Sequence, residues 1–137
     1  MDTIIEIETQ SRTITTSSPL ELVENLTSII GFQPNNESIV IINTDTISNK
    51  VISCKIISTL DMFNILEHIN NEDSNVGTIL CYYTKQPLDR VRPSAERLFD
   101  YLNGLINVRD ILFIRHNRWG SFICFDDLCC PPNGRIF

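Results

Sequence analysis

The run Gly77-Thr78-Ile79-Leu80-Cys81-Tyr82-Tyr83 is nearly all apolar. A short apolar run without polar alternation is typical of a strand that is buried on both faces of a sheet. The run therefore predicts the central strand of a sheet.

The segments that follow this run predict a helix and two further strands. Residues 94–106 carry apolar side chains at helical spacing, and residues 109–115 and 119–124 are strand-like. The two strands are joined tightly through His116 and Asn117. The apolar face of the predicted helix is formed by Leu98, Tyr101, Leu102 and Leu105.

The segments before the central run predict a hairpin and a helix. Residues 38–43 and 51–57 are β-branched runs, and the loop 44–50 between them contains Asn and Asp, which predicts an antiparallel hairpin. Residues 60–70 predict a helix. Its inward side chains are expected to be Met62, Phe63, Leu66 and Ile69.

A further helix is predicted over residues 19–30. Ser18 is suited to the N-cap, Pro19 to the first helical position, and Glu21 completes a capping box. Gly31 ends the helix because glycine reaches the left-handed conformation without a steric cost. Its apolar stripe consists of Leu22, Val23, Leu26, Ile29 and Ile30.

The N-terminal residues 3–9 alternate between apolar and polar side chains and predict a strand, with a possible return strand over residues 13–16. Strands that alternate with helices predict an α/β or α+β fold. We expect a single domain over residues 1–137, with a mixed β-sheet of five to seven strands and about three helices.

The composition narrows the classes of function. Apolar residues make up 42% of the chain and charged residues 20%, which is typical of a globular protein. The formal net charge of −6 argues against a general nucleic-acid binder, which normally carries a basic surface. Seven arginines nevertheless lie in the last third of the chain: Arg90, Arg92, Arg97, Arg109, Arg115, Arg118 and Arg135.

Targeting signals are not evident. No apolar run approaches the roughly 18 residues that a membrane-spanning helix requires, and the start Met1-Asp2-Thr3 lacks the pattern of a signal peptide. We therefore expect a soluble cytoplasmic protein without a membrane partner, in which the five cysteines are thiols or metal ligands rather than disulfides.

The turn between the last two predicted strands is the candidate ligand site. Arg115 and Arg118 supply guanidinium groups, which suit phosphate or carboxylate. Trp119 offers an indole face for a planar ring, and His116 and Ser121 add polar groups beside it. These five residues predict a site for a small anionic or nucleotide-like molecule. In a structural alternative, Arg118 pairs with a carboxylate and Trp119 covers an edge of the core, the possible carboxylates being Asp126 and Asp127.

Cys124, Cys129 and Cys130 are candidate zinc ligands. Adjacent cysteines rarely both reach one metal ion, so packing as small buried side chains is the favoured interpretation, and a redox disulfide is a third one. A fourth zinc ligand would have to come from His116, Cys54 or Cys81.

A hydrolase is the least supported class of function. His116 with Ser121 or Cys124 would supply a base and a nucleophile, but the serine lacks the Gly-x-Ser-x-Gly elbow. The chain also lacks a Gly-rich phosphate loop and a paired-carboxylate motif. We therefore expect a binding protein, with enzymatic activity left open.

Short motifs stand at both ends of the predicted domain. They are Ser18-Pro19, Gly31-Phe32-Gln33-Pro34, Ser38-Ile39-Val40, Arg118-Trp119, Ser121 to Cys124, and Cys129-Cys130-Pro131-Pro132. With these motifs the chain resembles a bacterial, mainly actinobacterial, family called domain of unknown function 4192. The resemblance covers about residues 14–137 and implies a fold and a site more than an activity. The sequence differs from that family at Gly120, where the family usually has a second tryptophan, and at Asn133, where it usually has glutamate.

These observations predict a regulatory or sequestering protein that binds a small anion. The alternative class is a structural domain that forms oligomers without a ligand. The apolar segment 119–124 and the terminal pair Ile136-Phe137 favour a homo-oligomer in either case, because an exposed apolar edge needs cover.

Overall fold

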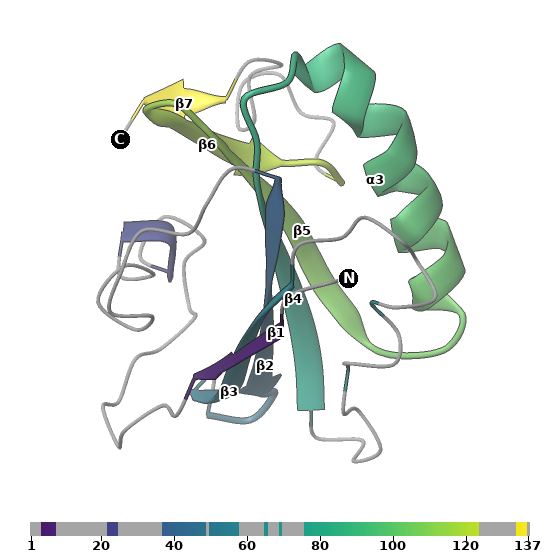
Figure 1. Cartoon of the computed structure of the whole chain (residues 1–137). Coiled ribbons are helices and arrows are strands. Elements are labelled where there is room, and N and C mark those ends of the chain that lie inside the picture. The colour runs from purple at the N-terminus through teal and green to yellow at the C-terminus, as the bar shows by residue number, and fades with distance from the viewer. Residues whose placement is uncertain are drawn as a thin grey trace.

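The computed structural model describes residues 4–7, 22–24, 37–48, 50–57, 65, 69, 76–123 and 134–136. Within them, seven strands and the helix α3 follow one another along the chain (Figure 1). The elements are β1 (Ile4–Ile7), β2 (Ser38–Asp45), β3 (Val51–Ile57), β4 (Val76–Tyr83), α3 (Leu88–Asn103), β5 (Val108–Arg115), β6 (Arg118–Ser121) and β7 (Arg135–Ile136).

The strands form one mixed sheet in the order β1-β3-β2-β4-β5-β6-β7. Strands β4 and β5 are parallel and are connected by α3, whereas the other neighbouring strands are antiparallel. A predominantly antiparallel sheet with one such crossover is an α+β arrangement. The predicted mixed sheet and the predicted hairpin of β2 and β3 are therefore confirmed.

The last predicted helix differs from α3 at both ends. The prediction began at Ser94, directly after Pro93, but α3 begins at Leu88 and includes Pro93 in its second turn. Burial of Leu88 and Val91 against the sheet stabilises this first part of the helix. The helix also ends earlier than predicted, at Asn103, with Gly104 as its C-cap.

The C-terminal strands differ from the prediction as well. Strand β6 ends at Ser121, and residues 122–123 form a bend instead of continuing the strand to residue 124. The two-residue strand β7 was not predicted; it pairs with the first half of β6.

Several predicted segments lie outside the described residues. They include the return strand 13–16 and most of the helices 19–30 and 60–70. Within the helix 19–30, residues 22–24 are described and are helical, and within 60–70 Ile65 is helical.

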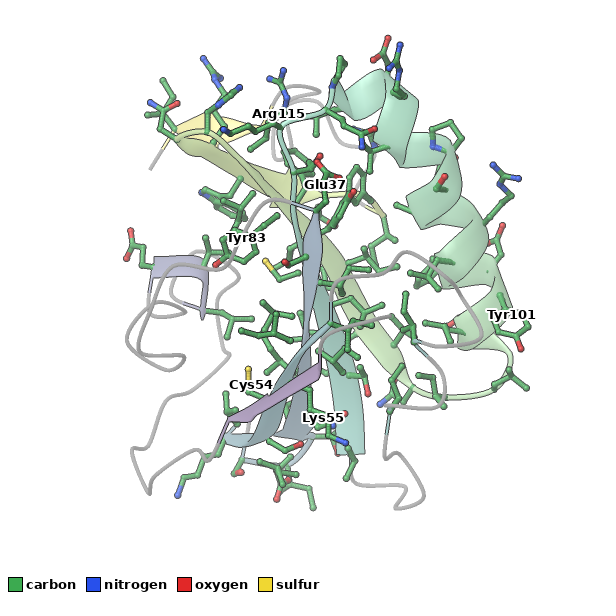
Figure 2. All side chains as sticks on the ribbon, viewed as in Figure 1. Glu37, Cys54, Lys55, Tyr83, Tyr101 and Arg115 are labelled. Carbon is green, nitrogen blue, oxygen red and sulfur yellow. The ribbon has the colours of Figure 1, made fainter. Side chains whose placement is uncertain are left out.

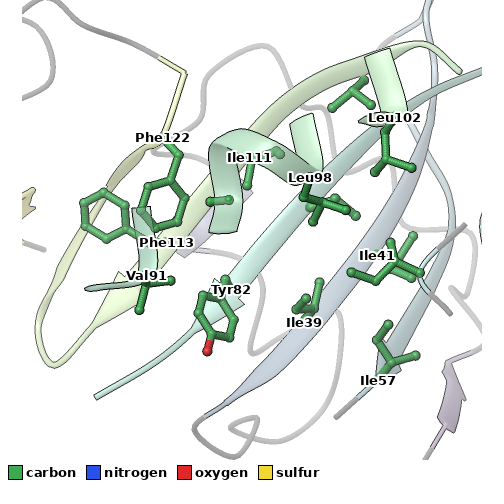
Figure 3. Close-up of a cluster of buried hydrophobic side chains, with 14 of the residues drawn as sticks. Ile39, Ile41, Ile57, Tyr82, Val91, Leu98, Leu102, Ile111, Phe113 and Phe122 are labelled. Atoms are coloured by element: carbon green, nitrogen blue, oxygen red, sulfur yellow. The ribbon is translucent and has the colours of Figure 1, made fainter. Parts of the chain in front are cut away.

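Side chains pack on both faces of the sheet, as the apolar run in β4 predicted. Figure 1 shows α3 along one face, which we call the α3 face, and residues 22–24 on the other side, which we call the opposite face. The α3 face (Figure 3) includes Ile39, Ile41, Ile57, Leu80, Tyr82, Leu98, Leu102, Ile111, Phe113 and Phe122. The opposite face includes Leu22, Val23, Val40, Ile42, Cys54, Ile56, Ile79, Cys81, Tyr83, Leu112, Ile114 and Trp119.

Gly120 has a clear role in the packing of the α3 face. A Cβ atom at this position would lie 2.5 Å from Cζ and 2.7 Å from Cε1 of Phe113, which is only 1% exposed. The Phe113 ring in turn packs on Phe122, with ring centroids 5.0 Å apart. A tryptophan at position 120 therefore does not fit while Phe113 keeps its place.

In the part of the chain that the structure describes, no helix has the length and apolarity needed to cross a membrane.

Candidate functional site

The turn between β5 and β6 brings Arg115 and Arg118 together. These two residues are direct partners in the antiparallel register, so only His116 and Asn117 lie between the strands. His116 has φ of 57°, the left-handed value that tight two-residue hairpin turns require at their first central position. Directly opposed residues project from the same face of a sheet, with Cβ atoms about 5 Å apart. The hairpin therefore places the two arginine side chains next to each other on one face of the sheet.

Each guanidinium group is held by a main-chain carbonyl. Arg115 Nε donates to the carbonyl of Gln86 over 2.8 Å, and Arg118 Nη1 donates to the carbonyl of Gly134 over 3.1 Å. Among the described residues, no carboxylate forms an ion pair with either arginine. Since a guanidinium group has five N–H donors, each arginine keeps donors for another acceptor.

Glu37 lies at the same end of the sheet, close to the loop between β4 and α3 (Figure 2). Its Oε1 accepts hydrogen bonds from Thr84 Oγ1 at 2.8 Å and from the Lys85 main-chain N–H at 3.3 Å. Its Oε2 accepts from the Tyr82 hydroxyl and from Gln86 Nε2, the latter at 3.1 Å. The carboxylate is thus occupied by four donors from one short segment of chain.

Two further properties mark the surroundings of Glu37. Its φ is 63°, in the left-handed region that residues other than glycine rarely adopt. The pKa of Tyr82 is raised, first by burial and then by the hydrogen bond to the Glu37 carboxylate. The Tyr82 hydroxyl therefore remains protonated and acts as a donor to Glu37.

Trp119 does not share a face with the arginines. Consecutive residues of a strand point to opposite faces, and Trp119 belongs to the buried cluster on the opposite face together with Tyr83 and Ile114. Its indole N–H is buried and has no hydrogen-bond partner among the residues that the structure describes. The predicted stacking of Trp119 on a group held by Arg118 is not what this arrangement provides; the indole covers the core.

Ser121 hydrogen-bonds within the fold instead of facing His116. Its hydroxyl donates to Asp110 Oδ1 over 2.6 Å and accepts from the main-chain N–H of Ile123 over 3.2 Å. Burial raises the pKa of Asp110, while the bonds from Ser121 and the Ile111 main chain lower it to a smaller extent. Ser121 is three residues along β6 from Arg118, or about 10 Å, and His116 lies beyond that end. The serine and the histidine are therefore not brought together as base and nucleophile.

The cysteines were considered as ligands of a zinc ion. Cys124, Cys129 and Cys130 lie outside the described residues, so their zinc site stays a prediction. Two proposed sources of a fourth ligand, Cys54 and Cys81, are buried free thiols on β3 and β4, with β2 between them. Burial raises the pKa of the Cys54 thiol to about 12, and it raises the pKa of Cys81 as well. Among the described residues, no three Cys, His, Asp or Glu side chains form a metal-binding group.

The contacts of Glu37 and Gln86 were not predicted from the sequence. A glutamate in the polar segment before a strand is usually solvated, and a carbonyl group carries no side-chain signal at all. Both are recognised only when β2 and β4 are paired, because Ser38 is opposite Tyr83 in that register. A pattern of residue types along the chain could not have found them.

Comparisons with other proteins found no relative. The chain matches no family model, no curated protein and no solved structure. The resemblance to the domain of unknown function 4192 family stays a prediction, and the functional argument rests on the geometry of the site.

Proposed function

We propose that this protein binds a small anion between Arg115 and Arg118, at the end of the sheet where β4 and β5 finish. The observation that carries the proposal is the direct opposition of the two arginines in the hairpin. Like charges on directly opposed strand residues repel each other and destabilise the pair. A bound phosphate or carboxylate group would relieve that repulsion and would accept the N–H donors that the two carbonyl contacts leave over.

The surroundings of the arginines favour a simple anion over two other kinds of ligand. Trp119 lies on the opposite face, so it offers no platform for the base of a nucleotide held by Arg118. A zwitterion such as an amino acid would also need an acceptor for its ammonium group. The carboxylate of Glu37 already accepts four hydrogen bonds and has no lone pair left for such a group.

The proposed role is recognition without catalysis. The arrangement supplies positive charge and hydrogen-bond donors, and Ser121 is engaged with Asp110 instead of with a histidine. Such a site suits a regulatory or sequestering protein that responds to the concentration of an anion.

Titration calorimetry with inorganic phosphate, pyrophosphate and citrate tests the proposal. We expect binding of at least one of them at low ionic strength and a marked loss in the double variant Arg115→Ala/Arg118→Ala. A charge-assisted contact contributes about 1.5–3 kcal/mol, so each arginine should account for roughly 10- to 100-fold in affinity. Raising the salt concentration should weaken the binding only in part, because both arginines are half-buried.

Arg97→Ala is the matched control. Arg97 is an exposed arginine of α3, so its replacement removes the same charge away from the hairpin. Equal losses in Arg97→Ala and in the double variant would mean that binding depends on net charge alone. That result, or binding that survives in the double variant, would contradict the proposal.

A further inference from the structure

We infer that Glu37 is the positioning residue of the anion site, and this inference rests on the proposed function. Glu37 holds the loop between β4 and α3 in a fixed shape, and a carbonyl of that loop fixes the side chain of Arg115. Glu37 itself does not touch the anion.

The first step is the contact between Glu37 and the loop. The loop residues Thr84, Lys85 and Gln86 each give the Glu37 carboxylate one hydrogen bond, from a hydroxyl, a main-chain N–H and a side-chain amide respectively. Thr84 Oγ1 also accepts the main-chain N–H of Gln86 over 2.9 Å. The carboxylate is therefore the common acceptor around which these three residues are arranged.

The second step connects the loop to Arg115. The Thr84 main-chain N–H donates to the carbonyl of Ile114 over 3.0 Å, and the Gln86 carbonyl accepts from Arg115 Nε over 2.8 Å. The loop is thus tied to the last two residues of β5 at two points. If Gln86 moved, Arg115 would lose the contact that fixes the direction of its guanidinium group.

The third step is the backbone of Glu37 itself. Its main-chain N–H donates to the carbonyl of Tyr83 over 2.6 Å, and its φ of 63° turns the chain into β2. A residue other than glycine in this conformation costs free energy that surrounding contacts must offset, and such residues concentrate at functional sites. Glycine would adopt this φ without strain, but it would lack the carboxylate with which Glu37 holds the loop.

The direction in which anion affinity changes when the Glu37 charge is removed distinguishes a positioning role from a purely electrostatic one. Glu37 carries a negative charge at the same end of the sheet as Arg115 (Figure 2). If Glu37 acted on the anion only through its charge, its removal would strengthen anion binding. If Glu37 positions Arg115, its removal should weaken binding in spite of the lost repulsion.

The test compares Glu37→Gln and Glu37→Ala with the control Asp89→Asn. Asp89 is an exposed carboxylate in the first turn of α3, so its replacement removes a negative charge at the same end without disturbing the loop. Two quantities are measured on each protein: the affinity for pyrophosphate by calorimetry, and the exchange rate of the Arg115 Nε–H by NMR in the absence of ligand. An Arg115→Lys variant assigns that NMR signal.

We expect slow Nε–H exchange in the wild-type protein and in Asp89→Asn. In Glu37→Ala the exchange should be at least several-fold faster and the affinity at least several-fold lower, with Glu37→Gln between the two. Asp89→Asn should bind pyrophosphate equally or more tightly. Unchanged Nε–H exchange in Glu37→Ala, or tighter binding in both Glu37 variants, would overturn the inference.

The two measurements also separate this inference from the proposed function. A wild-type protein that binds no anion would contradict the function, whereas the exchange rate would still show whether Glu37 positions Arg115. Conversely, anion binding that depends on Arg115 and Arg118 but not on Glu37 would support the function and contradict the positioning role.

Discussion

The two ends of the parallel pair β4 and β5 both carry arginine, but they use it differently. At the end where these strands begin, Arg109 Nη1 donates to the hydroxyl of Thr44 over 3.0 Å, and Thr44 donates to the carbonyl of Gly77 over 3.1 Å. At the end where they finish, Arg115 and Arg118 donate to main-chain carbonyls at the surface of the sheet. The first arginine contacts residues of the neighbouring strands, whereas the other two are opposed across a turn.

The two ends differ in the polar groups that surround the arginines. At the same end of the sheet as Arg109, buried hydroxyl and amide groups form a network, in which Thr78 donates to Asn43 Oδ1 over 2.9 Å and Asn43 donates to Ser53 over 3.0 Å. Buried polar groups of this kind are satisfied within the fold and add to its stability. At the other end, the carboxylate of Glu37 is occupied by the β4–α3 loop and, within the described part of the chain, is not paired with an arginine. We therefore expect the first end to contribute mainly to stability, and the second is the end at which we propose a ligand site.

The largest expected effect is a difference in stability between an arginine variant at one end and an arginine variant at the other. Arg109→Ala should lower the free energy of unfolding by about 1.5–3 kcal/mol, because it removes a charge-assisted hydrogen bond to a buried hydroxyl. Arg118→Ala should change the same quantity by less than about 1 kcal/mol, since Arg118 stands at a hairpin turn and loses a single bond to a main-chain carbonyl. Urea denaturation of both variants measures the difference.

A structural pairing of Arg118 with a carboxylate would reverse this expectation. Asp126 and Asp127 lie outside the described residues, so the pairing considered from the sequence is tested by mutation. If Arg118→Ala and Asp126→Asn destabilise the protein equally and by more than about 1 kcal/mol, Arg118 is a structural residue and the contrast between the two ends fails.

A smaller effect is expected at the glycine that makes room for Arg109. A Cβ atom on Gly77 would overlap Cδ of Arg109 and lie 2.7 Å from its Cγ and 3.2 Å from Cγ2 of Thr46. Gly77→Ala should therefore destabilise the protein by about 1–2 kcal/mol, because Arg109 must move away from Thr44. A thermal melt that shows no loss of stability would mean that Arg109 can move freely.

Gly104→Ala is the matched control for that variant. A Cβ atom at Gly104 meets nothing within 4 Å, and its φ of −81° suits alanine. The substitution should be neutral or should stabilise the protein by up to about 1 kcal/mol, through the reduced entropy of the unfolded chain.

The sequence predicted those elements whose pattern is local. The apolar run of β4 and the β-branched runs of β2 and β3 were read correctly, because a strand buried on both faces leaves few polar residues in its interior. The predicted start of α3 was wrong because proline usually occurs in the first turn of a helix, whereas Pro93 lies inside α3. Strand β7 is too short to show any periodicity.

Of the candidate site, the sequence predicted only the pair Arg115 and Arg118, whose positions depend on the hairpin turn alone. A two-residue turn at His116 and Asn117 is enough to place Arg115 opposite Arg118. The alternation of side chains in β6 also follows from that turn, and it moves Trp119 to the other face. The contacts of Glu37 with Thr84 and Gln86 depend on a pairing between residues almost 50 positions apart, which no local pattern specifies.

The smallest expected effect concerns Asp110, a carboxylate next to Arg109 in the sequence that hydrogen-bonds Ser121. Burial raises its pKa above the ordinary value of 3.8, so the folded protein favours the protonated form. The stability that this preference contributes is fully present below pH 3.8 and is lost as the pH rises through the folded-state pKa. Ionised Asp110 therefore makes the wild-type protein less stable at neutral pH than a neutral residue of the same shape would.

Asp110→Asn should remove this cost and keep the acceptor for the Ser121 hydroxyl. We expect the variant to melt at a higher temperature than the wild type at pH 7, and the two melting temperatures to converge as the pH falls toward 3.8. Asp100→Asn on the exposed side of α3 corrects for the change in net charge. A variant that melts lower than the wild type at pH 7 would show that the folded protein needs the charge of Asp110.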